Sequence, residues 1–145
     1  MIAYHFTSRF YLPAILREGV RKGDVSTSSK KGFNAPMLTV DLDWEQDWAL
    51  AARNYTVLNK TEVRLTVRIP EDNRAQVLTW EDVVKKYKVD KFWDEAQHFN
   101  VDPSRFLFYM GVILPEWIQK VDLRPDLEEF EWEALVDSES QKPYK

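Results

Sequence analysis

Short apolar runs alternate with polar, turn-forming segments along this chain, and the pattern predicts a mixture of strands and helices. Residues 2–6 form an apolar run rich in strand-forming types. Thr7 and Ser8 follow this run and can cap a helix, which we expect to continue to residue 18 and to stop at Gly19. The chain is therefore predicted to open with a strand, a cap and a helix.

The next part of the chain predicts a loop, a short strand and an aromatic helix. Residues 20–36 combine Gly, Pro and Asn with a cluster of Ser and Thr, which is typical of a loop. Residues 37–42 form a short apolar strand. Asp43 can then cap a helix in which Trp44 and Trp48 recur at helical spacing.

Two later segments predict strands in different surroundings. In residues 61–69, apolar residues alternate with Arg and Thr, as a strand with one buried and one polar face requires. Residues 106–114 are continuously apolar, which favours a central strand buried on both faces, with a bulge at Gly111. Residues 117–123 predict a further short strand.

Helices are predicted in the remaining segments. Thr79 and Asp82 have the spacing of a capping box that opens a helix through about Tyr87. Residues 92–99 predict another short helix. The acidic stretch at 124–145 predicts a C-terminal helix followed by a mobile tail.

The order of these elements predicts the fold class. It runs strand, helix, loop, strand, helix, strand and then mainly strands, so it lacks the regular alternation of a parallel α/β fold. We therefore expect an α+β fold. A length of 145 residues, with no internal repeat and no linker-like segment, favours one domain that spans residues 1–145.

Composition narrows the class of protein further. The chain has no Cys and 2 His, which excludes disulfide and thiol chemistry and argues against a His-rich metal site. The first residues show no basic segment followed by an apolar one, and no apolar run approaches the ~20 residues that span a bilayer. These features predict a cytoplasmic protein that has no membrane partner and no bound metal.

The charge argues against a general nucleic-acid-binding protein. The net charge is -4, whereas such proteins are normally basic. Two groups of lysines leave a local basic groove open as an alternative, although a charge run is more often a solvated face. These groups are Lys30 and Lys31, and Lys85, Lys86, Lys88 and Lys91.

The candidate chemistry lies in an arrangement of residues rather than in a standard motif. No Walker, GxGxxG, HExxH or GxSxG pattern occurs in the sequence. His5 ends the first strand, before a polar cap and a helix, where an imidazole can donate or accept a hydrogen bond to a ligand. The alternative role for His5 is that of a polar residue satisfied within the strand end.

Several segments resemble the ADP-ribosyltransferase superfamily. They are YHFTS at 4–8, LPAILREGV at 12–20, MLTVD at 37–41 and ILPEWI at 113–118. Within the superfamily, the chain is similar to DNA-targeting ADP-ribosyltransferase toxins and to short uncharacterised bacterial and phage proteins. The resemblance covers residues 2–70 and 106–123, and it implies a split, mainly antiparallel sheet with flanking helices.

The resemblance also implies NAD as the substrate and no metal. The first-strand His of the family hydrogen-bonds the nicotinamide ribose, and the resemblance implies this role for His5. Met37 stands where the family has a stacking aromatic, and Trp48 is an alternative stacking residue; for both, core packing is the other interpretation. The expected NAD contacts are His5, Phe6, Thr7, Ser8, Met37, Leu38, Thr39, Trp48 and Arg53.

The catalytic carboxylate of the family is missing from its usual place. Transferases of this superfamily use a Glu at the start of a late strand to stabilise the cationic sugar that forms as nicotinamide leaves. Aligned on ILPEWI, that position falls at Arg105 or Phe106. Asp102 and Glu95 are therefore the candidate catalytic acids, provided that the loop at 90–104 folds over the site.

Arginines predict a second way to hold a nucleotide. They can clamp a pyrophosphate through bidentate hydrogen bonds, and RNA 2′-phosphotransfer, a related activity in the superfamily, relies on Arg and His rather than Glu. Surface charges or strand-face salt bridges are the alternative interpretation. The arginines concerned are Arg9, Arg53, Arg64, Arg68 and Arg105.

Three functional hypotheses follow. The first is a NAD-dependent mono-ADP-ribosyltransferase that modifies a macromolecule, either nucleic acid or protein, and that acts alone or with an antitoxin-like partner. The second is a catalytically inactive relative that binds a nucleotide or a partner, for example a phage inhibitor of a bacterial defence complex; the missing carboxylate, the small size and the acidic tail motivate it. The third is an α+β domain in which the motifs determine only the fold.

Overall fold

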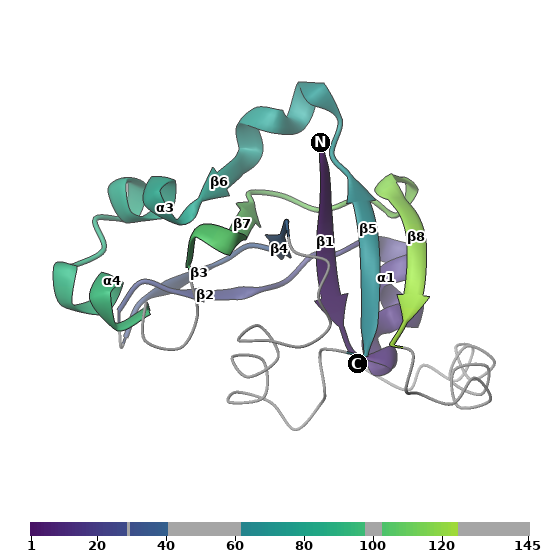
Figure 1. Ribbon diagram of the computed structural model, residues 1–145, viewed down its shortest axis with the longest axis horizontal. Helices are drawn as coiled ribbons and strands as arrows, with labels where there is room; N and C mark the ends of the chain where they lie inside the picture. The colour runs from purple at the N-terminus through teal and green to yellow at the C-terminus, as the bar shows by residue number, and fades with distance from the viewer. Residues whose placement is uncertain (29, 41–61, 98–102, 125–145) are drawn as a thin grey trace.

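The computed structural model describes residues 1–28, 30–40, 62–97 and 103–124, and within them an antiparallel sheet of six strands dominates (Figure 1). The strands are β1 (Ile2–Thr7), β4 (Met37–Thr39), β5 (Val63–Arg68), β6 (Val77–Thr79), β7 (Phe106–Tyr109) and β8 (Ile118–Leu123). Their order across the sheet is β6-β7-β4-β1-β5-β8. The flanking helices are α1 (Leu12–Glu18), α3 (Trp80–Tyr87) and α4 (Lys91–Gln97), with the 3-10 turns η1 (Arg9–Tyr11), η2 (Glu71–Gln76), η3 (Pro103–Arg105) and η4 (Pro115–Trp117). The predicted α+β class is confirmed.

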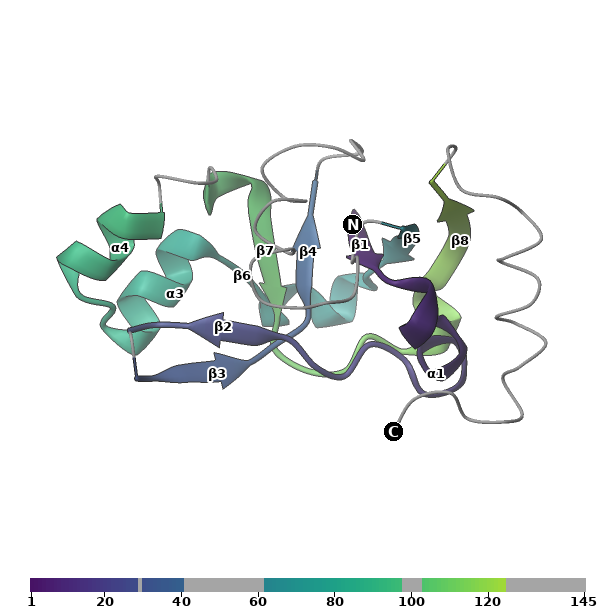
Figure 2. The ribbon, with the colours of Figure 1, turned by 90° about the horizontal axis from the view of Figure 1, so that it is seen from below.

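The sheet consists of two halves that meet at one residue pair. We call β1, β5 and β8 the long half, and β4, β7 and β6 the short half. All six residues of β1 pair with β5, whereas the described residues of β1 and β4 pair at Tyr4 and Thr39 alone. The strands of the two halves run in different directions. Strands β1 and β5 lie in the plane of the page in Figure 1 and are foreshortened in Figure 2, whereas β4 shows the reverse. If β1 and β4 paired over more residues, the angle between them would be limited to the modest twist of an ordinary sheet.

Strand β5, in the middle of the long half, has one buried face and one polar face. Val63, Leu65 and Val67 of β5 are completely buried and pack in a cluster with Leu12 of α1. The intervening Arg and Thr side chains of β5 lie on the other face and are partly or fully exposed. Helix α1 lies behind this half in Figure 1. The alternation predicted for residues 61–69 is therefore confirmed over β5.

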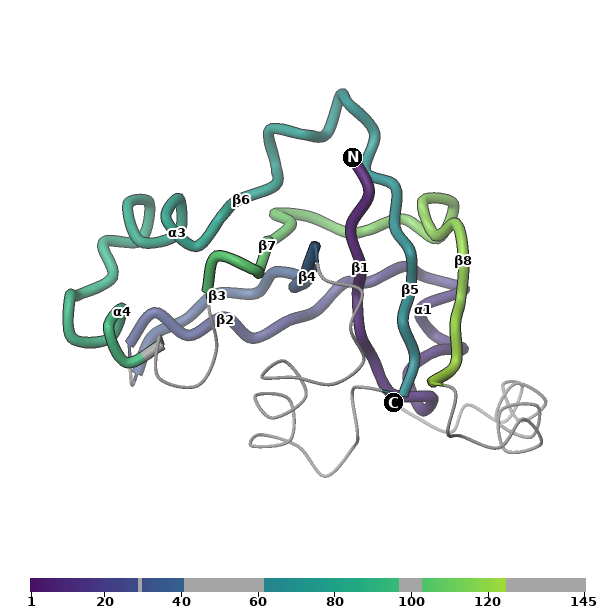
Figure 3. Tube along the Cα trace, in the orientation of Figure 1, coloured from purple at the N-terminus to yellow at the C-terminus, as the bar shows by residue number. Residues whose placement is uncertain are grey.

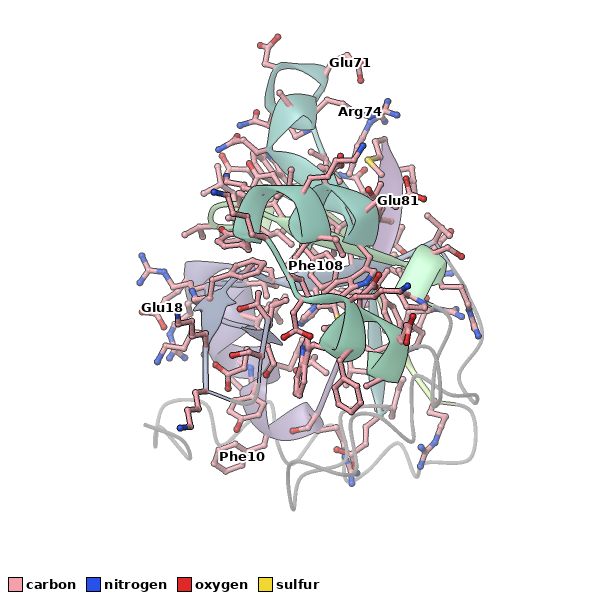
Figure 4. The ribbon with its side chains drawn as sticks, turned by 90° about the vertical axis from the view of Figure 1, so that its left-hand side faces the viewer. Phe10, Glu18, Glu71, Arg74, Glu81 and Phe108 are labelled. Atoms are coloured by element: carbon pink, nitrogen blue, oxygen red, sulfur yellow. The ribbon has the colours of Figure 1, made fainter. Side chains whose placement is uncertain are left out.

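The short half is buried on both faces at β7. Leu107 and Tyr109 join the cluster of the long half, whereas Phe106 and Phe108 pack into a second cluster beneath α3. The ring of Trp80, on α3, lies 6.1 Å from the ring of Phe108, which Figure 4 shows in the interior of the molecule. Because successive side chains of a strand point to opposite faces, these four residues confirm the predicted strand with two buried faces.

The opening of the chain folds as its sequence predicts. The Oγ of Ser8 accepts a hydrogen bond from the backbone N–H of Phe10 (3.0 Å) and so caps η1, which leads into α1. Gly19 ends α1 with a φ of 87°, a conformation that favours glycine. A Cβ at Gly19 would overlap the carbonyl oxygen of Ile113, which accepts the N–H of Val20 (2.9 Å). This turn therefore ties the end of α1 to the segment that follows β7.

Helix α3 begins at the predicted capping box. The Oγ1 of Thr79 accepts the N–H of Asp82 (3.1 Å), and the Asp82 carboxylate accepts the N–H of Thr79 (2.9 Å). The bond from the Thr79 backbone is the main cause that holds the pKa of Asp82 below its ordinary value. The helix ends at Tyr87, as predicted, and Lys88 follows with a φ of 52°.

The extents of three predicted elements were wrong. The loop predicted at 20–36 contains a hairpin of β2 (Asp24–Ser26) and β3 (Gly32–Asn34), whose strands are too short to show a periodic pattern. The strand predicted at 106–114 ends at Tyr109, because the N–H of Gly111 turns back to the Tyr109 carbonyl (3.0 Å). Strand β4 ends at Thr39, earlier than the predicted residue 42.

Other predictions were incomplete or fall outside the described residues. Turn η2 and strand β6 were not predicted, since neither has a periodic apolar face. The helix capped by Asp43 and nearly all of the C-terminal segment at 124–145 lie outside the described residues. Within the described part of the chain, no helix combines the length and the apolar character needed to cross a membrane.

The chain crosses repeatedly between the two halves of the sheet. Figure 3 follows it from β1 in the long half through the β2–β3 hairpin to β4 in the short half. It then returns to β5, passes on to β6 and β7, and ends in the long half with β8. Neither half is therefore a continuous segment of the sequence.

Candidate functional site

His5 lies where the two halves of the sheet separate. It shares a face of β1 with Ala3 and Thr7, and it pairs with Leu65 of β5. Its Nδ1 lies 2.8 Å from the carbonyl oxygen of Met37, on β4. Because a carbonyl oxygen can only accept, Nδ1 carries the proton, and in the neutral ring Nε2 is then the acceptor nitrogen. The partly exposed imidazole thus bridges β1 and β4 beside their residue pair.

Three strands place one residue each in a row beside His5. Tyr4 of β1 pairs with Thr39 of β4, which in turn pairs with Phe106 of β7. The buried Oγ1 of Thr39 donates a hydrogen bond to the carbonyl oxygen of Arg105 (2.9 Å). Strand β4 therefore lies between β1 and the start of β7. We call the following set the junction: His5, Met37, Thr39 and Phe106.

The expected NAD contacts within the described residues are mainly buried. The buried ones are Phe6, Thr7, Ser8, Leu38 and Thr39. Leu38 belongs to the cluster of the long half, and the Ser8 hydroxyl is engaged in capping η1. His5 and Met37 are the partly exposed members, and Met37 also packs against the second cluster. The structure thus brings the His5 ring to the main-chain carbonyl of Met37, while the Met37 side chain lies on the opposite face of the sheet, with Thr39.

Arg9 is held by Glu62, which sequence reasoning missed. Its Nε donates to Oε2 of Glu62 (3.0 Å), its Nη2 lies 2.6 Å from the same oxygen, and its backbone N–H donates to Oε1 (3.2 Å). The two side chains are 21% and 13% exposed, so water screens the pair weakly. Glu62 directly precedes β5. In the sequence, the one indication of its role was an acidic side chain near the start of a predicted strand.

A second arginine forms a cross-strand pair. Arg64 of β5 and Asp122 of β8 are register partners, and Nη2 of Arg64 donates to Oδ2 of Asp122 (3.2 Å). Salt bridges, the alternative interpretation of the arginines, are therefore confirmed for Arg9 and Arg64. Arg68 is exposed on β5, and Arg53 lies outside the described residues.

The position that the resemblance gives to the catalytic Glu carries no acid here. Arg105 and Phe106 stand there, and Phe106 is buried in the second cluster. The side chain that pairs with Thr39 across the sheet is therefore an aromatic ring.

The two candidate acids have different outcomes. Glu95 lies on α4, far from β1 in both Figures 1 and 2, and its Oε1 is 4.0 Å from Nζ of Lys91. The structure therefore does not bring Glu95 to His5. Asp102 lies outside the described residues, as does the candidate stacking residue Trp48.

The junction offers hydrogen-bonding groups rather than a cluster of charges. Its polar groups are an imidazole, a hydroxyl and main-chain carbonyls, which can orient a polar ligand. Among residues 1–28, 30–40, 62–97 and 103–124, no group of three or more His, Asp or Glu side chains is placed to hold a metal ion. Comparisons of the chain with protein-family models, with curated proteins and with solved structures found no match.

Proposed function

We propose that this chain is an ADP-ribosyltransferase-like protein that binds NAD at the junction and transfers its ADP-ribose to a macromolecule. The observation that carries the proposal is the adjacency of β1, β4 and β7, with His5 at the point where the sheet divides. The segments YHFTS and MLTVD, which resemble the superfamily, meet there through Tyr4 and Thr39. A sheet in two halves is also what that resemblance implies.

The role proposed for His5 is to orient the nicotinamide ribose. The bond from Nδ1 to the Met37 carbonyl fixes the ring and makes Nε2 the acceptor nitrogen. A ribose hydroxyl would donate to Nε2. Since the ring is already held by β4, little conformational entropy is lost when the ligand binds.

The proposed transfer replaces one bond at the ribose. The bond between the nicotinamide nitrogen and ribose C1′ breaks, and nicotinamide leaves as a neutral molecule with the bonding electron pair. A nucleophilic atom of the target forms the new bond to C1′, and its proton passes to the solvent. Asp102 is the carboxylate proposed to stabilise the cationic sugar, because Glu95 lies on the distant α4.

The test combines binding and transfer measurements on matched variants. Titration calorimetry with NAD compares the wild type with His5→Ala and with Tyr4→Phe, which alters the opposite face of the same strand. We expect His5→Ala to weaken NAD binding roughly tenfold, as loss of one good hydrogen bond predicts, and Tyr4→Phe to change it little. Asp102→Asn should retain NAD binding but lose transfer of labelled ADP-ribose to a cell lysate. NAD binding that is absent, or equal in both β1 variants, would refute the site.

A second candidate function is NAD binding without transfer, by a catalytically inactive relative that acts by holding a partner, such as a phage inhibitor of a bacterial defence complex. Arg105 and Phe106, at the place of the family's Glu, favour it. In this case the wild type binds NAD through His5 but labels nothing, and a pull-down from bacterial lysate retains a stable partner. Arg105→Glu would then gain transfer activity, whereas labelling by the wild type would exclude this candidate.

A further inference from the structure

The fold gathers two groups of lysines, distant in sequence, at one end of the molecule. One group lies in the turn between β2 and β3, and the other at the end of α3 and the start of α4. In both Figures 1 and 2 this turn and these two helices form the left-hand extremity. All six residues are exposed. We call them the lysine tip: Lys30, Lys31, Lys85, Lys86, Lys88 and Lys91.

Two contacts hold the parts of the lysine tip together. The ring of Phe33, on β3, stacks on Tyr87 of α3 with centroids 4.1 Å apart and planes at 6°. The Nε1 of Trp93, on α4, donates a hydrogen bond to the carbonyl oxygen of Ser26 on β2 (3.0 Å). The hairpin is thus docked on both helices, so the lysines belong to one fixed surface.

The lysine tip is locally basic although the protein is acidic. Residues 27–33 and 84–97 contain six lysines but three acids, in a chain whose net charge is -4. Two of these acids are engaged within the fold, because Asp90 accepts the N–H of Trp93 (2.8 Å) and Asp94 accepts Nε1–H of Trp80 (2.6 Å). An anionic partner would therefore attract this end of the molecule and repel the rest.

A large apolar side chain protrudes beside one of these lysines. Phe92 is 80% exposed at the start of α4, next to Lys91, whose side chain is 90% exposed. Peripheral proteins combine exposed aromatic side chains with lysines when they enter the boundary between lipid headgroups and acyl chains. The lysines would lie at the level of the anionic headgroups.

We propose that the lysine tip, together with Phe92, binds the surface of membranes that contain anionic lipids. The shape of the molecule favours this partner over a nucleic acid, because the tip is a projecting end that can meet a flat surface. Proteins that bind single-stranded nucleic acids instead use a groove with several stacking residues. The proposal rests on the fold and not on the proposed NAD site.

Vesicle flotation with the full chain tests this proposal. Vesicles of phosphatidylcholine with phosphatidylserine should retain the protein, vesicles of phosphatidylcholine alone should not, and added salt should release it. The double change Lys85→Ala and Lys88→Ala should lower the partition coefficient roughly 25-fold, about fivefold for each lysine. Phe92→Ser should lower it about tenfold, because the ring no longer leaves water.

The matched control removes the same charge elsewhere. Arg68→Ala with Lys120→Ala changes two exposed basic residues of the long half and should leave the partition coefficient almost unchanged. Circular dichroism verifies that each variant is folded. Equal loss in the control and in the tip variants would overturn the proposal. Retention of a single-stranded oligonucleotide through the same lysines, without retention by anionic vesicles, would also overturn it and assign the surface to nucleic acid.

Discussion

The two halves of the sheet are stabilised in different ways. In the long half, β1 and β5 pair along all six residues, β5 and β8 pair at five positions, and β5 buries one face. The short half has strands of three or four residues, and β7 buries side chains on both faces. The short half thus packs against α3 on one face and against the core of the long half on the other. The junction lies where one arrangement gives way to the other.

The strongest test of this difference removes packing from the short half. Phe108 is 2% exposed and packs beside Trp80, so Phe108→Ala should cost about 3–5 kcal/mol of unfolding free energy. Amide exchange should show protection falling in β4, β6 and β7 before β1 and β5. Leu65→Ala, in the fully paired β5, is the comparison, and it should lower protection in the long half. Equal loss of protection throughout the sheet in both variants would contradict the division.

The second prediction concerns the connection between α1 and the segment after β7. Gly19→Ala adds a Cβ that overlaps the Ile113 carbonyl oxygen at a residue with φ of 87°. The variant should lose about 1–3 kcal/mol, measured by urea denaturation. Leu16→Ala, at an exposed position of α1, is the control and should change stability less. If both variants behave alike, the connection contributes nothing specific.

The third prediction concerns the pairing at the junction. Thr39→Val keeps the shape of the side chain but removes the hydroxyl that donates to the Arg105 carbonyl, so it should cost about 1 kcal/mol. Thr66→Val, on the polar face of the long half, should stay within about 0.5 kcal/mol of the wild type. Thermal unfolding of both variants measures the difference. A loss of stability in Thr66→Val that exceeds the loss in Thr39→Val would contradict this contribution of the Thr39 hydroxyl to the junction.

The smallest effect is expected at α3, which covers the short half. The folded-state pKa of Asp82 is lowered by its bonds to Thr79, so this contribution to stability is full above the ordinary pKa of Asp and is lost as pH falls through the lowered value. Asp82→Asn should therefore reduce the loss of Tm on acidification from neutral pH. Asp72→Asn, on the exposed η2, is the control. An unchanged acid profile in Asp82→Asn would argue against the capping box as its source.

The elements that the sequence could predict are those with a local signal of their own. The alternation in 61–69 and the spacing of Thr79 and Asp82 are local signals, and both elements formed as predicted. The continuous apolar run at 106–114 correctly indicated two buried faces but not the end of β7, which depends on the turn at Gly111. Strands of three residues such as β2 and β3 carry no periodic signal of their own.

The candidate site depends even more on contacts between distant residues. His5 could be selected from the sequence, since a polar residue near the end of a strand is a local pattern, although β1 continues past it to Thr7. Its bond to the Met37 carbonyl depends on the register of β1 against β4, which no local pattern specifies. The pair of Arg9 with Glu62 was missed for the same reason, because the two residues are 53 positions apart.

The repeated crossing of the chain between the halves has a consequence for its synthesis on the ribosome. Among the described strands, β8 is translated last, although it completes the half that begins with β1. Until Leu123 has left the exit tunnel, β5 has one unpaired edge, and an unpaired strand edge is a template for pairing with other chains. A nascent chain that stalls before Ile118 would therefore expose an unpaired strand edge that can pair with other chains, and chaperones that shield such edges would be needed until β8 has been synthesised.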